Sequence, residues 1–220
     1  MTKGQTDPKH LEASLAYLNR KGLFHHLDIE FQDFPKGGRS GSGDLKQFCI
    51  QAAKAPQSRP TIAGFDRDEP DILKEIMDSD AYFKNWGNNV FSFAIPVPSH
   101  RDSSPDVCIE LYCQDDEIKR VDLKGRRLFL SNQFDPQSGR HLNENLNCSD
   151  RSKFRNPKLL KIVDSDVFNN DHENIALPKS DFADLVLTGA QEFENFSFDE
   201  FANIYEIISS IGIVSSLDTS

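Results

Sequence analysis

Two aspartates separated by one residue follow a short apolar run, and their spacing suits metal binding. The run covers residues 61–65, and Asp66 and Asp68 come directly after it. In open α/β sheets, ligands bind beyond the carboxyl ends of the strands. Two carboxylates at such an end can converge on Mg²⁺, which usually takes one or two carboxylates together with water and phosphate oxygens. The spacing therefore predicts a site for Mg²⁺ or Mn²⁺.

Glu110 and Lys179 are two further candidates. Glu110 stands between apolar neighbours in the run 107–112, which we predict to be a strand. It either alternates to a solvated face or, in a strand buried on both faces, needs a partner. Lys179 is the only base in the last 59 residues and comes at the start of a predicted helix. A cation is electrostatically unfavourable at that end of a helix, which favours a functional role over a surface one.

The elements around these residues predict an α/β sheet with helices packed on it. The predicted strands cover residues 27–31, 61–65, 90–98, 107–112 and 128–130. The predicted helices run from Asp7 to near Gly22, from Asp44 through Ala53 and over residues 70–78, and two more helices end the chain. The last helix is expected to begin at the capping box formed by Ser197 and Glu200. Residues 35–44 are glycine-rich, but no GK[ST] follows, so they are predicted to be a connector rather than a phosphate-binding loop.

Composition bounds the class of protein. The chain has 220 residues, of which 37% are hydrophobic and 17 are Phe, enough for a substantial core. No apolar run approaches the roughly 20 residues of a membrane span, so we expect a cytoplasmic protein without a membrane partner. Its four Cys form no CxxC pair, which argues against a zinc ribbon or a disulfide scaffold.

Charge is unevenly distributed along the chain, whose net charge is −10. Residues 119–161 hold eleven Lys and Arg against four acidic residues, whereas residues 162–220 hold twelve acidic residues against Lys179 alone. A basic block inside an acidic chain can face a polyanion such as nucleic acid, or it can be a solvated loop. Lys124, Arg126 and Arg127 are the candidate nucleic-acid contacts in this block.

Four short motifs resemble the TOPRIM domain of OLD-type (overcoming lysogenization defect) nucleases. MTKGQTDPKHL resembles the opening motif Glu-Gly-x-x-Asp, with Gly4 and Asp7 at two of its positions and Lys3 at the position of the glutamate. GFDRDEP is similar to the Asp-x-Asp strand, and CIELY to the later acidic strand of these nucleases. ALPKSDFAD is similar to the segment that brings a lysine to their site, which is Lys179 here.

The resemblance implies a TOPRIM-like, mainly parallel sheet and two-metal cleavage of phosphodiesters in DNA or RNA. It implies Asp66, Asp68, Glu110 and Asp7 as metal ligands, and Asp66, Asp68 and Lys179 as catalytic residues. It divides the chain into a metal-binding core (1–115), an irregular basic insertion (116–176) and C-terminal helices that complete the domain (177–220). Proteins of this family are typically coupled to an ATPase domain or subunit and often serve phage defence, so such a partner is expected. The sequence leaves open whether the chain forms homo-oligomers.

Two departures from the family pattern leave a second function open. Lys3 puts an ammonium group where the family has a carboxylate, and no residues precede Met1 to form the strand before the first motif. A fragment, a modified version and a decayed copy of the domain are all compatible with this. The alternative to a nuclease is thus a catalytically impaired TOPRIM-like module that binds nucleic acid or has a regulatory role.

Overall fold

Short strands and six helices make up the part of the chain that the computed structural model describes, which is residues 1–2, 6–32, 41–77, 82–102, 106–156 and 158–217. The helices of this part are α1 (Asp7–Arg20), α2 (Ser42–Ala52), α3 (Pro70–Ile76), α4 (Asp115–Ile118), α5 (Lys179–Thr188) and α6 (Ala202–Leu217). Its strands are β1 (Thr61–Phe65), β2 (Lys84–Gly87), β3 (Val90–Ala94), β4 (Phe129–Leu130), β5 (Asn147–Cys148), β6 (Ile162–Val163) and β7 (Val167–Phe168). The chain is therefore of mixed α/β class, with small sheets. None of the described helices combines the length and the apolar character that crossing a bilayer requires.

The main sheet has the strand order β1-β3-β2. β1 and β3 are parallel, and β2 pairs with β3 in the antiparallel direction. On the other side of β1, Thr2 forms a parallel bridge to Gly64, and the amide of Gly64 donates to the carbonyl of Met1 over 3.0 Å. Met1 and Thr2 therefore lie beside β1, which pairs with β3 along its other edge.

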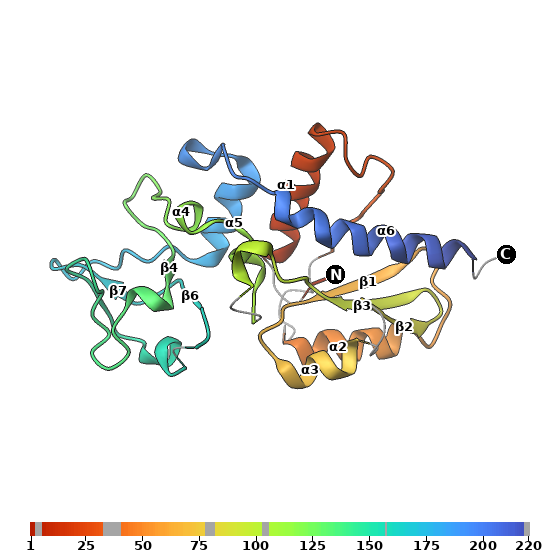
Figure 1. Ribbon diagram of the computed structural model, residues 1–220, viewed down its shortest axis with the longest axis horizontal. Coiled ribbons are helices and arrows are strands. Elements are labelled where there is room, and N and C mark those ends of the chain that lie inside the picture. The colour runs from red at the N-terminus through yellow and green to blue at the C-terminus, as the bar shows by residue number, and fades with distance from the viewer. Residues whose placement is uncertain (3–5, 33–40, 78–81, 103–105, 157, 218–220) are drawn as a thin grey trace.

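Helices cover both faces of this sheet (Figure 1). Side chains alternate along β3, so that Val90 and Ala94 pack with α2 and α3 in one apolar cluster, whereas Phe91 and Phe93 belong to the larger cluster with α1 and α6. β3 is buried along its whole length, and its sequence VFSFA fits this position because it carries apolar side chains on both faces. The hydroxyl of Ser92 fits there by donating to the carbonyl of Ile76 over 2.8 Å.

The insertion has an apolar cluster of its own. Its residues pair as β4 with β6 and as β5 with β7, both antiparallel. The buried members of this cluster all come from the insertion and are Phe129, Phe134, Cys148, Phe154, Val163, Val167 and Ala176. In Figure 1 the insertion lies at one end of the molecule and the main sheet at the other. The domain boundaries themselves stay predictions.

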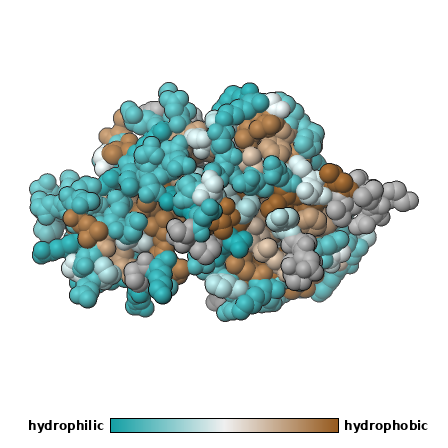
Figure 2. All heavy atoms as spheres, in the orientation of Figure 1, coloured by the Kyte–Doolittle hydropathy of each residue, from teal (hydrophilic) through white to brown (hydrophobic). Residues whose placement is uncertain are grey.

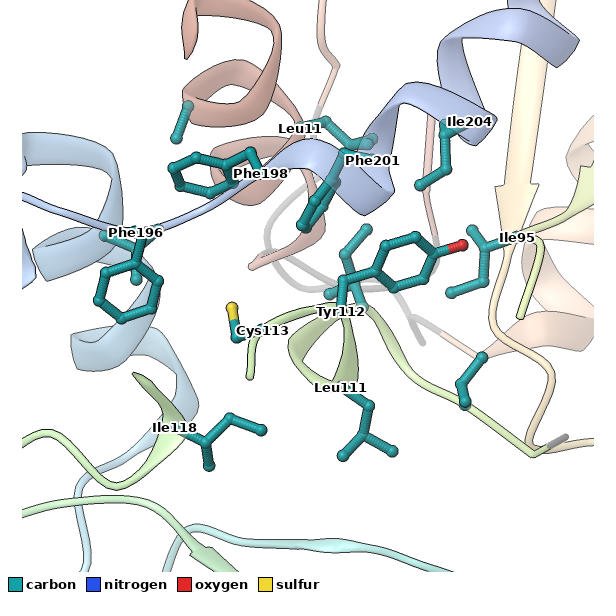
Figure 3. Packing of buried hydrophobic residues seen from close by; sticks show 14 of the residues in the cluster. Leu11, Ile95, Leu111, Tyr112, Cys113, Ile118, Phe196, Phe198, Phe201 and Ile204 are labelled. Atoms are coloured by element: carbon teal, nitrogen blue, oxygen red, sulfur yellow. The ribbon is translucent and has the colours of Figure 1, made fainter. Parts of the chain in front are cut away.

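Two predicted strands are wrong. Residues 27–31 form no strand, and their apolar side chains Leu27, Ile29 and Phe31 pack against the core without a pairing partner. Residues 109–112 form a 3₁₀ turn rather than a strand, with all four side chains buried. A short apolar run does not distinguish a buried strand from a buried helical turn, because neither leaves a polar face. Figure 3 shows the Tyr112 side chain of this turn near Phe201, whose ring centroid lies 4.7 Å away.

The predicted capping box is also absent. Residues 199–201 form a 3₁₀ turn, and α6 begins at Ala202. Glu200 instead accepts a hydrogen bond from the amide of Ser99 at 2.9 Å, and the Ser197 amide donates to Glu117. The carboxylate of Glu200 therefore binds Ser99, which is distant in the sequence, and does not cap α6. The apolar side chains Phe201, Ile204, Tyr205 and Ile211 are buried, whereas Ile208 is half-buried.

Candidate functional site

A cavity of about 470 Å³ lies between the main sheet and the insertion. Its lining combines acidic residues, three lysines and a few apolar side chains. These residues are Thr6, Asp7, Asp66, Asp68, Asp106, Cys108, Glu110, Lys153, Leu159, Leu160, Lys161, Ile162 and Lys179. The structure thus brings together Asp7, Asp66, Asp68, Glu110 and Lys179, all five residues of the predicted catalytic and metal site.

The ends of the strands and helices explain this convergence. Asp66 follows β1 directly, and the amide of Arg67 donates to the carbonyl of Val107 over 2.9 Å. This bond holds the Asp66–Asp68 loop beside the segment that leads to Glu110. Asp7 is the first residue of α1, and Lys179 is the first residue of α5, the helix that packs along α1. Asp7, Asp66 and Lys179 therefore come from the ends of helices or strands, whereas Glu110 lies within the 3₁₀ turn at residues 109–112.

Glu110 and Lys179 form an ion pair in the cavity. The Lys179 Nζ lies 2.8 Å from Oε2 of Glu110, whose side chain is 2% exposed. Burial is the largest single influence on Glu110 and would raise its pKa, but the charge and hydrogen bond of Lys179, together with smaller contributions from other neighbours, outweigh it and bring this pKa to about 2. Burial acts against the charged form of Lys179 as well, yet the negative charge of Glu110 and the hydrogen bond that Glu110 accepts from Nζ raise the pKa of Lys179 above the ordinary value. Both groups are therefore charged at neutral pH.

Cys108 contributes a neutral thiol to this pair. Its Sγ lies 3.8 Å from Nζ of Lys179. Burial raises the pKa of Cys108 well above the ordinary thiol value. Because the thiol keeps its proton, Glu110 supplies the negative charge that holds Lys179 in place.

Asp66 is surrounded by other carboxylates. Burial and, after it, the negative charges of Asp7, Glu110 and Asp68 raise its pKa well above the ordinary value, whereas Lys179 acts in the opposite direction. Repulsion between neighbouring carboxylates is relieved when they share a cation. Asp66 is thus the residue on which the negative charges of the other three carboxylates act together.

The donor chemistry of the cavity fits a hard divalent cation. Its acidic lining offers carboxylate oxygens, which Mg²⁺ and Mn²⁺ prefer, and its one thiol is protonated. Among the described residues, no three His, Cys, Asp or Glu side chains form a ready-made metal-binding group. Mg²⁺ usually takes only one or two carboxylates from the protein and keeps several waters.

His10 interacts electrostatically with Glu110 and Lys179 of the cavity and was not expected from the sequence. It is fully buried in α1, and its ring stands 5.8 Å from that of Phe182 in α5, centroid to centroid. Neither ring nitrogen has a hydrogen-bond partner among the described residues. Burial lowers the pKa of His10 to about 4, so the ring is neutral at pH 7. Its position three residues after Asp7 was the signal in the sequence, because such residues share a helix face.

The nucleic-acid contacts predicted at Lys124, Arg126 and Arg127 are not part of the cavity. Arg126 pairs with Asp122 at 2.8 Å and with Asp181 at 3.0 Å. Arg127 pairs with Glu144, and its guanidinium lies over the ring of Phe129. Both arginines thus have internal carboxylate partners that compete with phosphate, while Lys124 is exposed. Two other residues of the same basic block, Lys153 and Lys161, do line the cavity. They were not among the predicted nucleic-acid contacts.

The chain was compared with family models, curated proteins and solved structures. None of them matches it. The resemblance to TOPRIM nucleases therefore rests on the short motifs alone. Lys3 and Gly4 of the first motif lie outside the described residues.

Proposed function

We propose that this chain is a divalent-cation-dependent phosphodiesterase module that cleaves nucleic acid, with its site in the cavity between the main sheet and the insertion. One observation carries the proposal: Asp7, Asp66, Asp68, Glu110 and Lys179 come from four separate segments and line one cavity. The parallel pairing of Thr2, β1 and β3 supports a TOPRIM-like arrangement of that edge of the sheet. The proposed substrate class is DNA or RNA.

The roles follow from charge and position. Asp66 and Asp68 would hold Mg²⁺ or Mn²⁺, with Asp7 and Glu110 close enough to influence Asp66 electrostatically. Bound cations of this kind hold the scissile phosphate, activate a water and stabilise the leaving oxygen. Lys179 would bind the phosphate and stabilise the negative charge that grows on it. Glu110 keeps Lys179 charged and fixes it at the wall of the cavity until the substrate phosphate competes for the ammonium group.

Cleavage assays with variants test this proposal. Single- and double-stranded DNA and RNA are incubated with the protein and Mg²⁺ or Mn²⁺. Asp66→Asn should abolish cleavage, and Lys179→Ala should reduce it by about 10²–10³-fold, the usual loss for one transition-state charge contact. Lys3→Glu, which restores the family's carboxylate, should increase cleavage. Asp116→Asn is the matched control, because Asp116 is an exposed carboxylate outside the cavity.

The outcomes separate the two candidate functions. Cleavage that needs a divalent cation and is lost in Asp66→Asn but kept in Asp116→Asn supports the phosphodiesterase. If well-folded wild type and Lys3→Glu bind the cation and nucleic acid but cleave no substrate, the phosphodiesterase is excluded and the non-catalytic binding module takes its place. Cleavage unchanged by Lys179→Ala would remove Lys179 from the reaction.

A further inference from the structure

Five basic residues follow one another along the insertion at the border of the cavity. These residues, called the basic rim below, are Arg151, Lys153, Arg155, Lys158 and Lys161. Lys153 and Lys161 line the cavity together with Leu159 and Leu160. The remaining three members are exposed and do not line it. The basic rim therefore begins inside the cavity and continues over the neighbouring surface. Hydrophilic side chains dominate the end of the molecule formed by the insertion on the face shown in Figure 2.

We propose that the basic rim is the surface that holds the sugar-phosphate backbone of a nucleic-acid strand while one of its phosphates occupies the cavity. This inference rests on the proposed function, because it assigns the contacts of that substrate outside the catalytic residues. It also moves these contacts away from Arg126 and Arg127.

The charges of the basic rim are available to a ligand. Among the described residues, the only ion pair that any of its members makes is between Lys153 and Asp164, at 3.1 Å. The two arginines at 126 and 127 differ, since each is paired with a carboxylate of the chain. A phosphate that approaches the basic rim has few internal carboxylates to displace, whereas at Arg126 it would have to displace two.

The backbone at residues 150–154 and at Lys161, the two ends of the basic rim, is fixed to the insertion core. Phe154 is buried and stacks on Phe134 with ring centroids 5.2 Å apart. At the other end, Lys161 and Ser131 are joined by two hydrogen bonds, of 2.8 Å between the Ser131 amide and the Lys161 carbonyl and of 3.0 Å between the Lys161 amide and the Ser131 hydroxyl. The Asp150 carboxylate accepts from the Ser152 amide and caps the 3₁₀ turn that carries Arg151 and Lys153. Cations on a fixed scaffold lose less entropy when they bind.

The extent of the basic rim favours a strand over a single nucleotide. One phosphate in the cavity would be within the reach of Lys179 and the lining lysines only. Arg151, Arg155 and Lys158 lie outside the lining, so they gain partners only if the ligand carries further phosphates beyond the cavity. A linear polyanion satisfies both conditions, because its charges repeat along the strand.

Salt-dependent binding tests the proposal without requiring cleavage. Fluorescence anisotropy with labelled 20-mer DNA and RNA strands and duplexes is measured in EDTA and in Ca²⁺ over a range of KCl concentrations. We compare wild type with Arg155→Gln/Lys158→Gln. The control is Arg20→Gln/Lys54→Gln, which removes the same charge from an exposed arginine and an exposed lysine outside the cavity lining.

The basic-rim variant should bind about 10-fold or more weakly at low salt. Its plot of log K against log[salt] should be flatter by about 1.4–1.8 units, which corresponds to two lost phosphate contacts. The control should match wild type. Equal losses in both variants, an unchanged slope, or no binding by the folded wild type would overturn the basic rim as the strand-binding surface. Inorganic phosphate or a mononucleotide that binds as tightly as a 20-mer would do so too.

Failure of this inference and failure of the proposed function give different results. Cleavage with normal affinity in Arg155→Gln/Lys158→Gln leaves the phosphodiesterase intact and rejects the basic rim. Binding that depends on the basic rim, without cleavage under any condition, supports the basic rim and rejects the phosphodiesterase.

Discussion

Lys179 Nζ lies 2.8 Å from Oε2 of Glu110, although the two residues are 69 positions apart in the chain. The contact joins the first residue of α5 to the buried 3₁₀ turn that follows the main sheet. It places an ammonium group at the wall of an acidic cavity, where a substrate phosphate can compete with the carboxylate for it. The contact between Glu110 and Lys179 is therefore both a stabilising pair and the resting state of the proposed site.

A double-mutant cycle on this pair measures its contribution to stability. Lys179→Met leaves the buried Glu110 without its cation and should lower the free energy of unfolding by roughly 2–3 kcal/mol. This is below the 3–5 kcal/mol typical of fully buried pairs, because the Lys179 side chain is 31% exposed. Glu110→Gln in the same chain should restore part of the loss. Urea unfolding gives the values, and the exposed pair of Lys9 and Asp184 serves as the control, with at most about 1 kcal/mol expected. Equal coupling energies for the two pairs would contradict the burial argument.

His10 should make the fold sensitive to acid. Its folded-state pKa of about 4 lies below the ordinary 6.5, so its contribution to stability is fully present above pH 6.5 and is lost as the pH falls toward 4. The whole shift corresponds to roughly 3 kcal/mol. Glu110, Lys179 and Lys9 are the charged groups that act on the ring.

The His10→Phe variant should therefore unfold with a flatter pH dependence between pH 4 and 6.5. At pH 7 it should be at least as stable as wild type, because it replaces a buried ring whose nitrogens have no partner among the described residues. Thermal unfolding at a series of pH values gives the result, with His25→Phe as the control at an exposed histidine. The same pH dependence in His10→Phe and wild type would show that His10 does not control acid stability.

Asp66→Asn should have opposite effects with and without metal. Without metal at neutral pH, the variant should be more stable than wild type, because the raised pKa of Asp66 means that its ionisation is unfavourable in the folded state. Wild-type stability should fall as the pH rises from 3.8 through that raised pKa, and the variant should lack this fall. With Mg²⁺ or Mn²⁺ at about 100 times the dissociation constant, wild type should gain about 2.7 kcal/mol. The variant should gain little. Thermal unfolding with Asp116→Asn as control separates these effects, and an equal gain in both variants would exclude Asp66 as a ligand.

Two glycines of the insertion offer a matched test of its packing. Gly139 and Gly125 both have positive φ, +74° and +77°, which L-residues with a side chain rarely adopt. A Cβ on Gly139 would lie 2.5 Å from the carbonyl oxygen of Cys148, whereas a Cβ on Gly125 would have no atom within 4 Å. Gly125→Ala should cost about 1 kcal/mol for its backbone conformation alone. Gly139→Ala should cost at least about 2–3 kcal/mol, because the clash adds to that strain. Urea unfolding that gives equal losses would show that the Gly139 turn differs from the one described.

Local patterns in the sequence determined several of these elements. The apolar run at residues 61–65 became β1, and Asp66 and Asp68 follow it at the edge of the sheet. Asp7 and Pro8 begin α1 as expected, since a proline fits the first turn of a helix. The isolation of Lys179 among acidic residues indicated a special position, and the structure gives that lysine a buried partner. These features depend on neighbours within a few residues, so the sequence alone contains them.

Tertiary structure alone decided which charged groups meet. Arg126 and Asp181 are 55 residues apart, and their ion pair gives Arg126 a carboxylate partner with which a phosphate would have to compete. Glu110 lies in a 3₁₀ turn because core side chains surround Ile109, Leu111 and Tyr112 on all sides, a condition that a short apolar run does not encode. The basic rim, in turn, borders the cavity because β6 pairs with β4 and Phe154 stacks on Phe134. An ion's partner and its burial depend on how distant segments pack, and charge patterns along the chain leave that packing open.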